Sequence, residues 1–132
     1  MKILYQGNKG AYSQLAAVEI FPNAELISSK TFEECFKKCS DDENLRAIIP
    51  IENSIAGRVA DIQYLMNKYK LQIYAEHFHK VSHNLIARPG VKISNLKYVR
   101  SHSQAISQCQ KLINEHNLEP IIAADTAGSA KY

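Results

Sequence analysis

Short apolar runs alternate with amphipathic stretches along the whole chain, and this alternation constrains the fold more than any other feature of the sequence. Runs such as 2–5, 46–50 and 119–123 have the length of buried strands. The stretches between them repeat apolar residues at helical spacing. Strands that alternate with helices are typical of an α/β protein.

The pattern and its boundary residues predict individual elements. Strands or extended runs are expected at 2–5, 25–27, 46–50, 71–80, 84–87, 96–100 and 119–123. Helices are expected at 12–20, 31–40, 59–69 and 101–116, and a last one is expected to begin at Asp125 or Thr126. Thr31 with Glu34, and Ser101 with Gln104, stand at the spacing of a capping box.

Composition and charge exclude several classes of protein. A net charge of +3 with no basic cluster does not indicate a nucleic-acid partner. No run approaches the roughly 18 apolar residues of a membrane span, and the N-terminus carries no signal peptide, so a cytoplasmic protein is expected.

The cysteines and histidines suggest no cofactor or metal. An odd count of three cysteines argues against a disulfide framework, and Cys35 and Cys39 are interpreted as small buried thiols. His77 and His79 would lie on one face of a strand, where a surface or packed pair is favoured over a metal site.

Polar segments lie at the junctions between a predicted strand and the helix that follows it. Such junctions are where α/β folds bind ligands. Segment 5–13, YQGNKGAYS, has two glycines that permit a sharp turn and present backbone N–H groups at a helix start. That arrangement suits an anion, although a plain tight turn explains it as well. Glu52, Asn53 and Ser54 directly follow a strand, and their side chains suit orienting a hydroxyl or carboxylate. A capped turn is the alternative there.

Three further segments have the same character. At 83–85 a surface pair on an edge strand is favoured over a site. At 101–109, Gln104 and Gln108 share a helix face, so Gln108 could reach a ligand at the helix start, but solvated glutamines are equally consistent. At 123–130 small residues would allow close approach of a ligand, and the alternative role of Asp125 is an N-cap.

The order of YQGxxGAYS, IPIENSxxGxV, SHxQAxxQC and DTAGSA resembles the prephenate dehydratase family over essentially the whole chain. The resemblance implies an α/β, type 2 periplasmic-binding-protein-like two-lobed fold with the site in its cleft. Lobe one would cover 1–76, and 77–132 would begin a second lobe that is incomplete, so 1–132 would be a partial catalytic domain. The phenylalanine-sensing ACT regulatory domain would be absent.

The resemblance also implies a reaction and the residues that serve it. The enzyme would be a carbon–oxygen hydro-lyase of L-phenylalanine biosynthesis that converts prephenate to phenylpyruvate, water and carbon dioxide without a cofactor. The catalytic positions that match are Asn53, Ser101, Gln108 and, with a less defined role, Glu52. The positions that match substrate-binding residues are Tyr5, Gly7, Gly10, Ala11, Tyr12, Ser54, Asp125, Thr126 and Ala127.

Two departures from the family pattern leave alternatives open. Ser103 stands where the family often has proline, and the Thr-Arg-Phe motif, whose threonine is expected to deliver a proton to the leaving hydroxyl, is not in the sequence. An arogenate dehydratase, or an inactive fragment that retains part of an anion-binding cleft, therefore stays possible. A solute-binding protein is disfavoured by the missing signal peptide. An open second lobe would expose sheet edge and apolar surface, so a homodimer or higher homo-oligomer is expected.

The missing motif predicts that the isolated chain turns over prephenate only weakly, because no residue would protonate the leaving hydroxyl. An assay of the purified chain with prephenate at neutral pH checks this. Turnover close to that of a full-length relative would contradict it.

Overall fold

The computed structural model describes residues 1–55, 57–59 and 61–131 and confirms the α/β class. The chain forms two compact units, Met1–Lys80 and Val81–Tyr132. The division falls beyond the lobe boundary expected after residue 76. That boundary stays a prediction.

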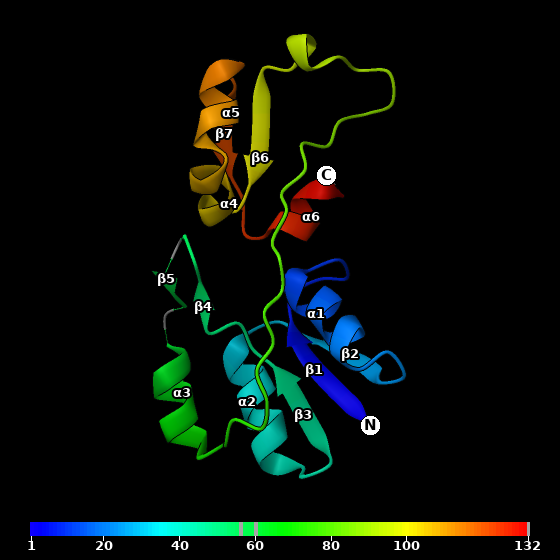
Figure 1. Cartoon of the computed structure of the whole chain (residues 1–132), viewed down its shortest axis with the longest axis vertical. Helices are drawn as coiled ribbons and strands as arrows, with labels where there is room; N and C mark the ends of the chain where they lie inside the picture. The colour runs from blue at the N-terminus through cyan, green and yellow to red at the C-terminus, as the bar shows by residue number, and fades with distance from the viewer. Residues whose placement is uncertain (56, 60, 132) are drawn as a thin grey trace. The chain divides into compact units, whose positions relative to one another are not determined.

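The first unit is built on a parallel sheet of order β2-β1-β3, formed by Glu25–Ser29, Lys2–Gln6 and Leu45–Ile48. Helices α1 (Tyr12–Ile20) and α2 (Phe32–Asp41) make the crossover connections (Figure 1). The central strand β1 buries Ile3, Leu4 and Tyr5, as its continuous apolar run predicts for a strand covered on both faces.

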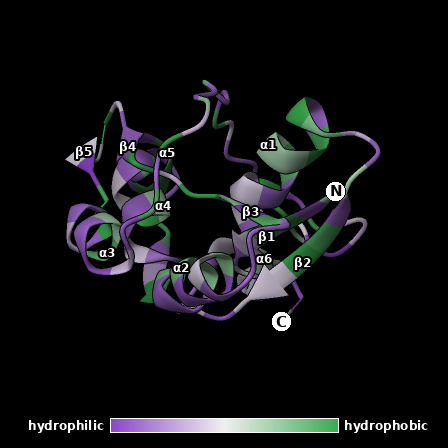
Figure 2. Cartoon of the chain, turned by 90° about the horizontal axis from the view of Figure 1, so that it is seen from below, coloured by the Kyte–Doolittle hydropathy of each residue, from purple (hydrophilic) through white to green (hydrophobic). Residues whose placement is uncertain are grey.

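Helices α2 and α3 (Ile62–Tyr69) pack on each other through the buried side chains of Phe36, Ile62 and Leu65. Figure 2 shows hydrophilic residues interrupting α2, whereas α1 is coloured mostly hydrophobic. The Glu33 carboxylate accepts a hydrogen bond from Lys68 Nζ at 2.6 Å, which lowers the pKa of Glu33. This ion pair is exposed, so it orients the two helices more than it stabilises them.

In the second unit β6 (Tyr98–Ser101) and β7 (Glu119–Ile122) form a parallel pair. Their connection contains α4 (Ser103–Gln108) and α5 (Gln110–Glu115), and α6 (Thr126–Ala130) follows β7 (Figure 1). A short 3₁₀ helix, Ile93–Asn95, precedes β6. The core of the second unit is the cluster of Ile106, Ile113 and Leu118.

Two expected helices differ from the structure. The helix expected at 59–69 begins only at Ile62, because Asp61 has a left-handed φ of 70° that cannot be part of a helix. Gly57–Arg58 instead forms strand β5, antiparallel to β4 (Glu52–Asn53). The helix expected at 101–116 is divided at Cys109, whose N–H is shared between the carbonyls of Ala105 and Ile106.

The strands expected at 71–80 and 84–87 are wrong for the described structure, which assigns neither segment to a strand. An extended run becomes a strand only when its backbone N–H and C=O groups pair with a neighbouring strand. The alternation at 71–75 marks a segment with strand character, but the pattern contains no information about a partner.

The remaining expectations on composition concern the thiols and membrane spans. All three cysteines are free, and burial raises the pKa of Cys35 and raises that of Cys39 to about 11, so both stay protonated at neutral pH. Within the described residues no helix has the length and apolar character needed to cross a bilayer.

The expected cap of α2 is confirmed and yields a stability prediction. Thr31 Oγ1 accepts from Glu34 N at 3.1 Å, and Glu34 Oε2 accepts from Lys30 N at 2.7 Å. Thr31→Ala should lower the free energy of unfolding by about 1 kcal/mol, because a helix N–H loses its acceptor. Urea titration measures this, with Thr31→Ser as the matched control that keeps the hydroxyl. An alanine variant as stable as the parent would contradict the assignment.

Candidate active site

The turn after β1 is shaped by its two glycines. Gly7 and Gly10 have φ of 110° and 94°, a region that residues with a Cβ rarely adopt. Gly7 N donates to Ser29 O at 3.0 Å, and Ser28 Oγ donates to Gly7 O at 2.6 Å. The turn is therefore fastened to the end of β2, and its backbone is held at the start of α1.

The start of α1 carries an unusual cap. Ala11 is the N-cap and supplies no side-chain acceptor to the first helical turn. Gln14 Oε1 accepts from Gly10 N at 2.6 Å, one residue before the cap. A helix that starts without a side-chain cap suits an anionic ligand. Among the predicted contacts, Tyr12 is half-buried, whereas Tyr5 is only 4% exposed and packs in the core.

The segment 52–54 follows β3, the parallel neighbour of β1, so it continues from the same carboxyl edge of the sheet as the glycine turn. Asn53 Oδ1 accepts from Ile55 N at 2.9 Å, a turn that fixes the orientation of the Asn53 amide. Glu52 lies opposite Arg58 in the hairpin, and both Glu52 and Ser54 are exposed. Asn53 is the half-buried member of the block.

In the second unit, Ser101 and the segment from 123 onwards leave the carboxyl ends of the paired strands β6 and β7. Ala123 N donates to Ser101 O at 2.9 Å, which holds the two segments together. Asp125 is confirmed as the N-cap of α6, where it accepts from Gly128 N. Thr126 and Ala127 form the half-buried first turn of this helix.

The expected cap of α4 is wrong. Ser101 is the last residue of β6, and His102 is the N-cap, with Nδ1 accepting from Gln104 N at 3.3 Å. Ser101 cannot be the N-cap because its backbone still pairs with β7, and the N-cap lies one residue further along the chain. The structure thus places the Ser101 hydroxyl at the strand end.

Gln108, the last residue of α4, is in contact with a residue that the sequence pattern did not favour as a site. His83 Nε2 lies 2.9 Å from Gln108 Oε1 in a partly buried contact. An amide oxygen can only accept, so the proton of this hydrogen bond resides on His83 Nε2. The bond orients the Gln108 amide. No spacing rule connects residues 25 positions apart.

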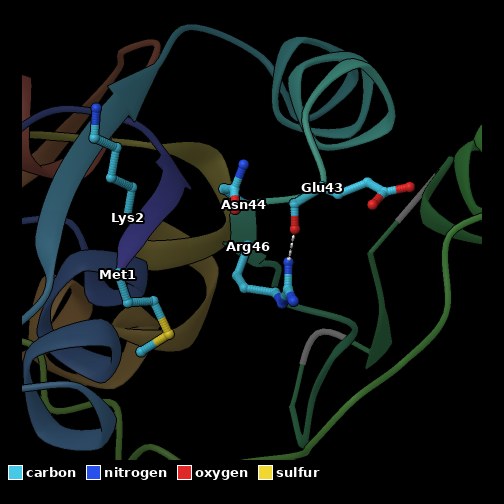
Figure 3. A pocket seen from close by; sticks show the side chains of 5 residues that line it. All are labelled: Met1, Lys2, Glu43, Asn44 and Arg46. Carbon is cyan, nitrogen blue, oxygen red and sulfur yellow. Dashed lines mark hydrogen bonds between the residues drawn. The ribbon is translucent and has the colours of Figure 1, made fainter.

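A shallow pocket of about 380 Å³ lies at the amino ends of β1 and β3, away from the predicted residues. Figure 3 shows its lining, with the Arg46 guanidinium donating to the Glu43 carbonyl oxygen. The residues around it are Met1, Lys2, Glu43, Asn44 and Arg46. Ligands of α/β sheets bind at the carboxyl ends of strands, so this pocket is not assigned to the chemistry.

Parallel strands that end in polar segments and are connected by helices are the arrangement of an α/β ligand-binding domain. A family model described as "PDT: Prephenate dehydratase" matches residues 3–132. The chain belongs to the prephenate dehydratase family.

Curated relatives resemble the chain over its whole length, but the chain spans a third to a half of theirs. An arogenate dehydratase 2 of Petunia hybrida is 38% identical over 132 residues, which are 100% of this chain and 34% of the relative. A bifunctional N-acyl-homoserine lactone acylase/prephenate dehydratase of Komagataeibacter europaeus is 36% identical over 98% of this chain and 46% of its own.

Solved structures confirm the two-lobed α/β fold class. The prephenate dehydratase of Staphylococcus aureus aligns with a TM-score of 0.85 and 26% identity over 99% of this chain and 50% of its own. GqqA, described as a novel type of quorum quenching acylase, aligns with a TM-score of 0.82 and 35% identity. The alignment covers 97% of this chain and 47% of the GqqA chain. The roles of individual site residues stay predictions.

The contact between His83 and Gln108 predicts a defined tautomer. Long-range ¹H–¹⁵N spectra of the neutral imidazole should show the proton of His83 on Nε2. Gln108→Leu should shift the population towards the other tautomer, because the acceptor is lost while the side chain keeps a similar volume. His116, which is exposed, is the internal control. A His83 spectrum that does not respond to the substitution would contradict the contact.

Proposed function

We propose that this chain contributes its glycine turn and its Asn53, Ser101 and Gln108 side chains to the decarboxylating dehydration of prephenate to phenylpyruvate. The observation that carries the proposal is the family match over residues 3–132. The position of the four motif segments at or just beyond carboxyl ends of strands supports it. The protein would be a carbon–oxygen hydro-lyase in L-phenylalanine biosynthesis.

The reaction places few demands on the protein. The bond between the ring and its carboxylate breaks, and the electron pair moves through the ring as carbon dioxide leaves. The carbon–oxygen bond to the ring hydroxyl breaks at the other end, and the departing oxygen takes a proton to become water. Aromaticity drives the change without redox chemistry, so no cofactor is required. The protein must hold two carboxylates and stabilise the charge that develops on the leaving oxygen.

The turn from Gly7 to Tyr12 is proposed to hold a carboxylate. Its support is the uncapped start of α1 at Ala11 and the fixed backbone of the two glycines. The positive end of a helix favours an anion there by about 0.3–1 kcal/mol or more when partly buried. Glu52, with an exposed carboxylate, would repel both a substrate carboxylate and the negative charge on the leaving oxygen, so it is proposed only as a member of the same block as Asn53, without a defined role.

Asn53 and Gln108 are proposed as oriented hydrogen-bond donors, with Ser101 supplying a hydroxyl. In each amide the oxygen already accepts a hydrogen bond, from Ile55 N in one case and from His83 in the other. Those bonds select the amide orientation before substrate arrives, which is the preorganisation that charge stabilisation requires. His83 is on this proposal a positioning residue that acts through Gln108.

Arogenate is the second candidate substrate, because several relatives are named arogenate dehydratases. It differs from prephenate by an amino group in place of the side-chain keto group, and the ring chemistry is unchanged. Comparing kcat/KM for the two substrates separates them. Binding without turnover would favour the alternative of an inactive fragment with a partial anion cleft.

Self-association is part of the proposal. Ile73, Tyr74 and Phe78 are 64%, 90% and 89% exposed, and burial of these large apolar side chains would favour a homodimer or higher homo-oligomer. A cytoplasmic location stays a prediction, and an Arabidopsis thaliana relative is named chloroplastic.

Asn53→Ala and Gln108→Ala, made in the whole protein, should each lower kcat by about 10²-fold, as removal of one preorganised donor does elsewhere. Stability should change little in comparison, since both side chains are only half-buried. Gln104→Ala is the matched control, because Gln104 is an exposed glutamine of the same helix. Turnover is followed by phenylpyruvate formation, and folding by circular dichroism. An unchanged rate constant in a folded variant would refute the assignment.

A further inference from the structure

Three metal-ligating side chains from distant parts of the sequence meet on the first unit. Glu19 belongs to α1, and His77 and His79 belong to the extended segment that follows α3 (Figure 1). His77 Nε2 and His79 Nδ1 each lie 2.9 Å from the same oxygen, Glu19 Oε2. The ligand atoms of all three lie within 4.8 Å of one another.

The backbone explains why the two imidazoles converge. Residues two apart in an extended segment point to the same side, and the ring centroids of His77 and His79 are 6.4 Å apart. His79 is held further by the ring of Tyr12, at 5.8 Å between centroids, and its side chain is only 16% exposed. Glu19 is half exposed and can adjust. His79 is thus a fixed ligand, His77 is its neighbour on the same side of the segment, and Glu19 is a carboxylate that can move to meet an ion.

We propose that Glu19, His77 and His79 form a binding site for a divalent transition metal ion of the zinc class. Two imidazoles and one carboxylate are a ligand set that zinc uses with a fourth position left to water. Imidazole-rich sites also bind nickel, cobalt and copper. The ligand set therefore defines the class of ion but does not select one metal within it.

The geometry requires only a small rearrangement to bind the ion. Ligands at about 2.1 Å in a tetrahedron lie about 3.4 Å from one another. The two contacts of 2.9 Å would therefore open by about 0.5 Å, within reach of the exposed Glu19 side chain, and the two histidine nitrogens, which lie within 4.8 Å of each other, would take the same spacing. A bound ion would fasten the extended segment to α1 beside Tyr12, the first residue of that helix.

A metal-free alternative uses the same three residues. The Glu19 carboxylate accepts hydrogen bonds from both rings, and such a hydrogen-bonded cluster needs no metal ion. The two possibilities differ in their response to zinc. A hydrogen-bonded cluster would not bind zinc, whereas a metal site would bind it with a defined stoichiometry, and the folded protein would be stabilised. The inference does not depend on the dehydratase activity.

Isothermal titration of the full chain with ZnCl₂, together with thermal unfolding, tests the proposal. One zinc per chain and a higher Tm with zinc are expected. The Co²⁺ adduct should show the visible absorption of a four- or five-coordinate site with nitrogen and oxygen ligands. His77→Ala and Glu19→Gln should each weaken zinc binding by about tenfold or more, because one of three ligands is lost.

His116→Ala is the matched control, since His116 is an exposed histidine at the end of α5, outside the cluster. It should bind zinc as the parent does. Glu19→Gln preserves the size of the side chain, and His77 is the more exposed histidine, so both variants should fold. Absence of zinc binding by the parent chain would overturn the proposal. Binding of undiminished affinity in His77→Ala and Glu19→Gln would overturn it as well.

Discussion

Parallel pairing of β1 with both of its neighbours is the constraint on which the first unit depends. Lys2–Gln6 pairs with β2 on one side and β3 on the other, so three strands end at one edge of the sheet. The polar segments that follow β1 and β3 leave the sheet at that edge because the strands run in the same direction. The pair β6 and β7 repeats the arrangement for Ser101 and the segment before α6.

Elements that bury a continuous apolar run or carry their own cap were predictable from the sequence. Strand β1 and helix α1 agree with expectation, because Ile3 and Leu4 need no partner to be recognised as core, and Pro22 follows the end of the helix. The start of α3 was not predictable, because the left-handed backbone of Asp61 has no signature in that residue type. The run 71–80 failed for a different reason, since strand formation depends on a partner that local patterning does not specify.

The candidate site divides in the same way. Its segments were located from the sequence because turn glycines and N-capping residues mark strand-to-helix junctions, and Asp125 does cap its helix. The contact that orients the Gln108 amide was not found from the sequence, because it joins remote positions. His83 meets Gln108, and Glu19 meets His77 and His79, only once the chain is folded. Relatives of one fold carry dehydratase and acylase names, so the fold alone would not have decided the chemistry.

The central claim is that ligand binds at the carboxyl edges of the strands and not in the pocket at their amino ends. Amide chemical-shift changes of the ¹⁵N-labelled chain on titration with prephenate test this most directly. The predicted result is a set of changes concentrated at Gly7–Tyr12, Asn53, Ser101 and Gln108. Changes confined to Lys2, Asn44 and Arg46, the pocket of Figure 3, would contradict the claim.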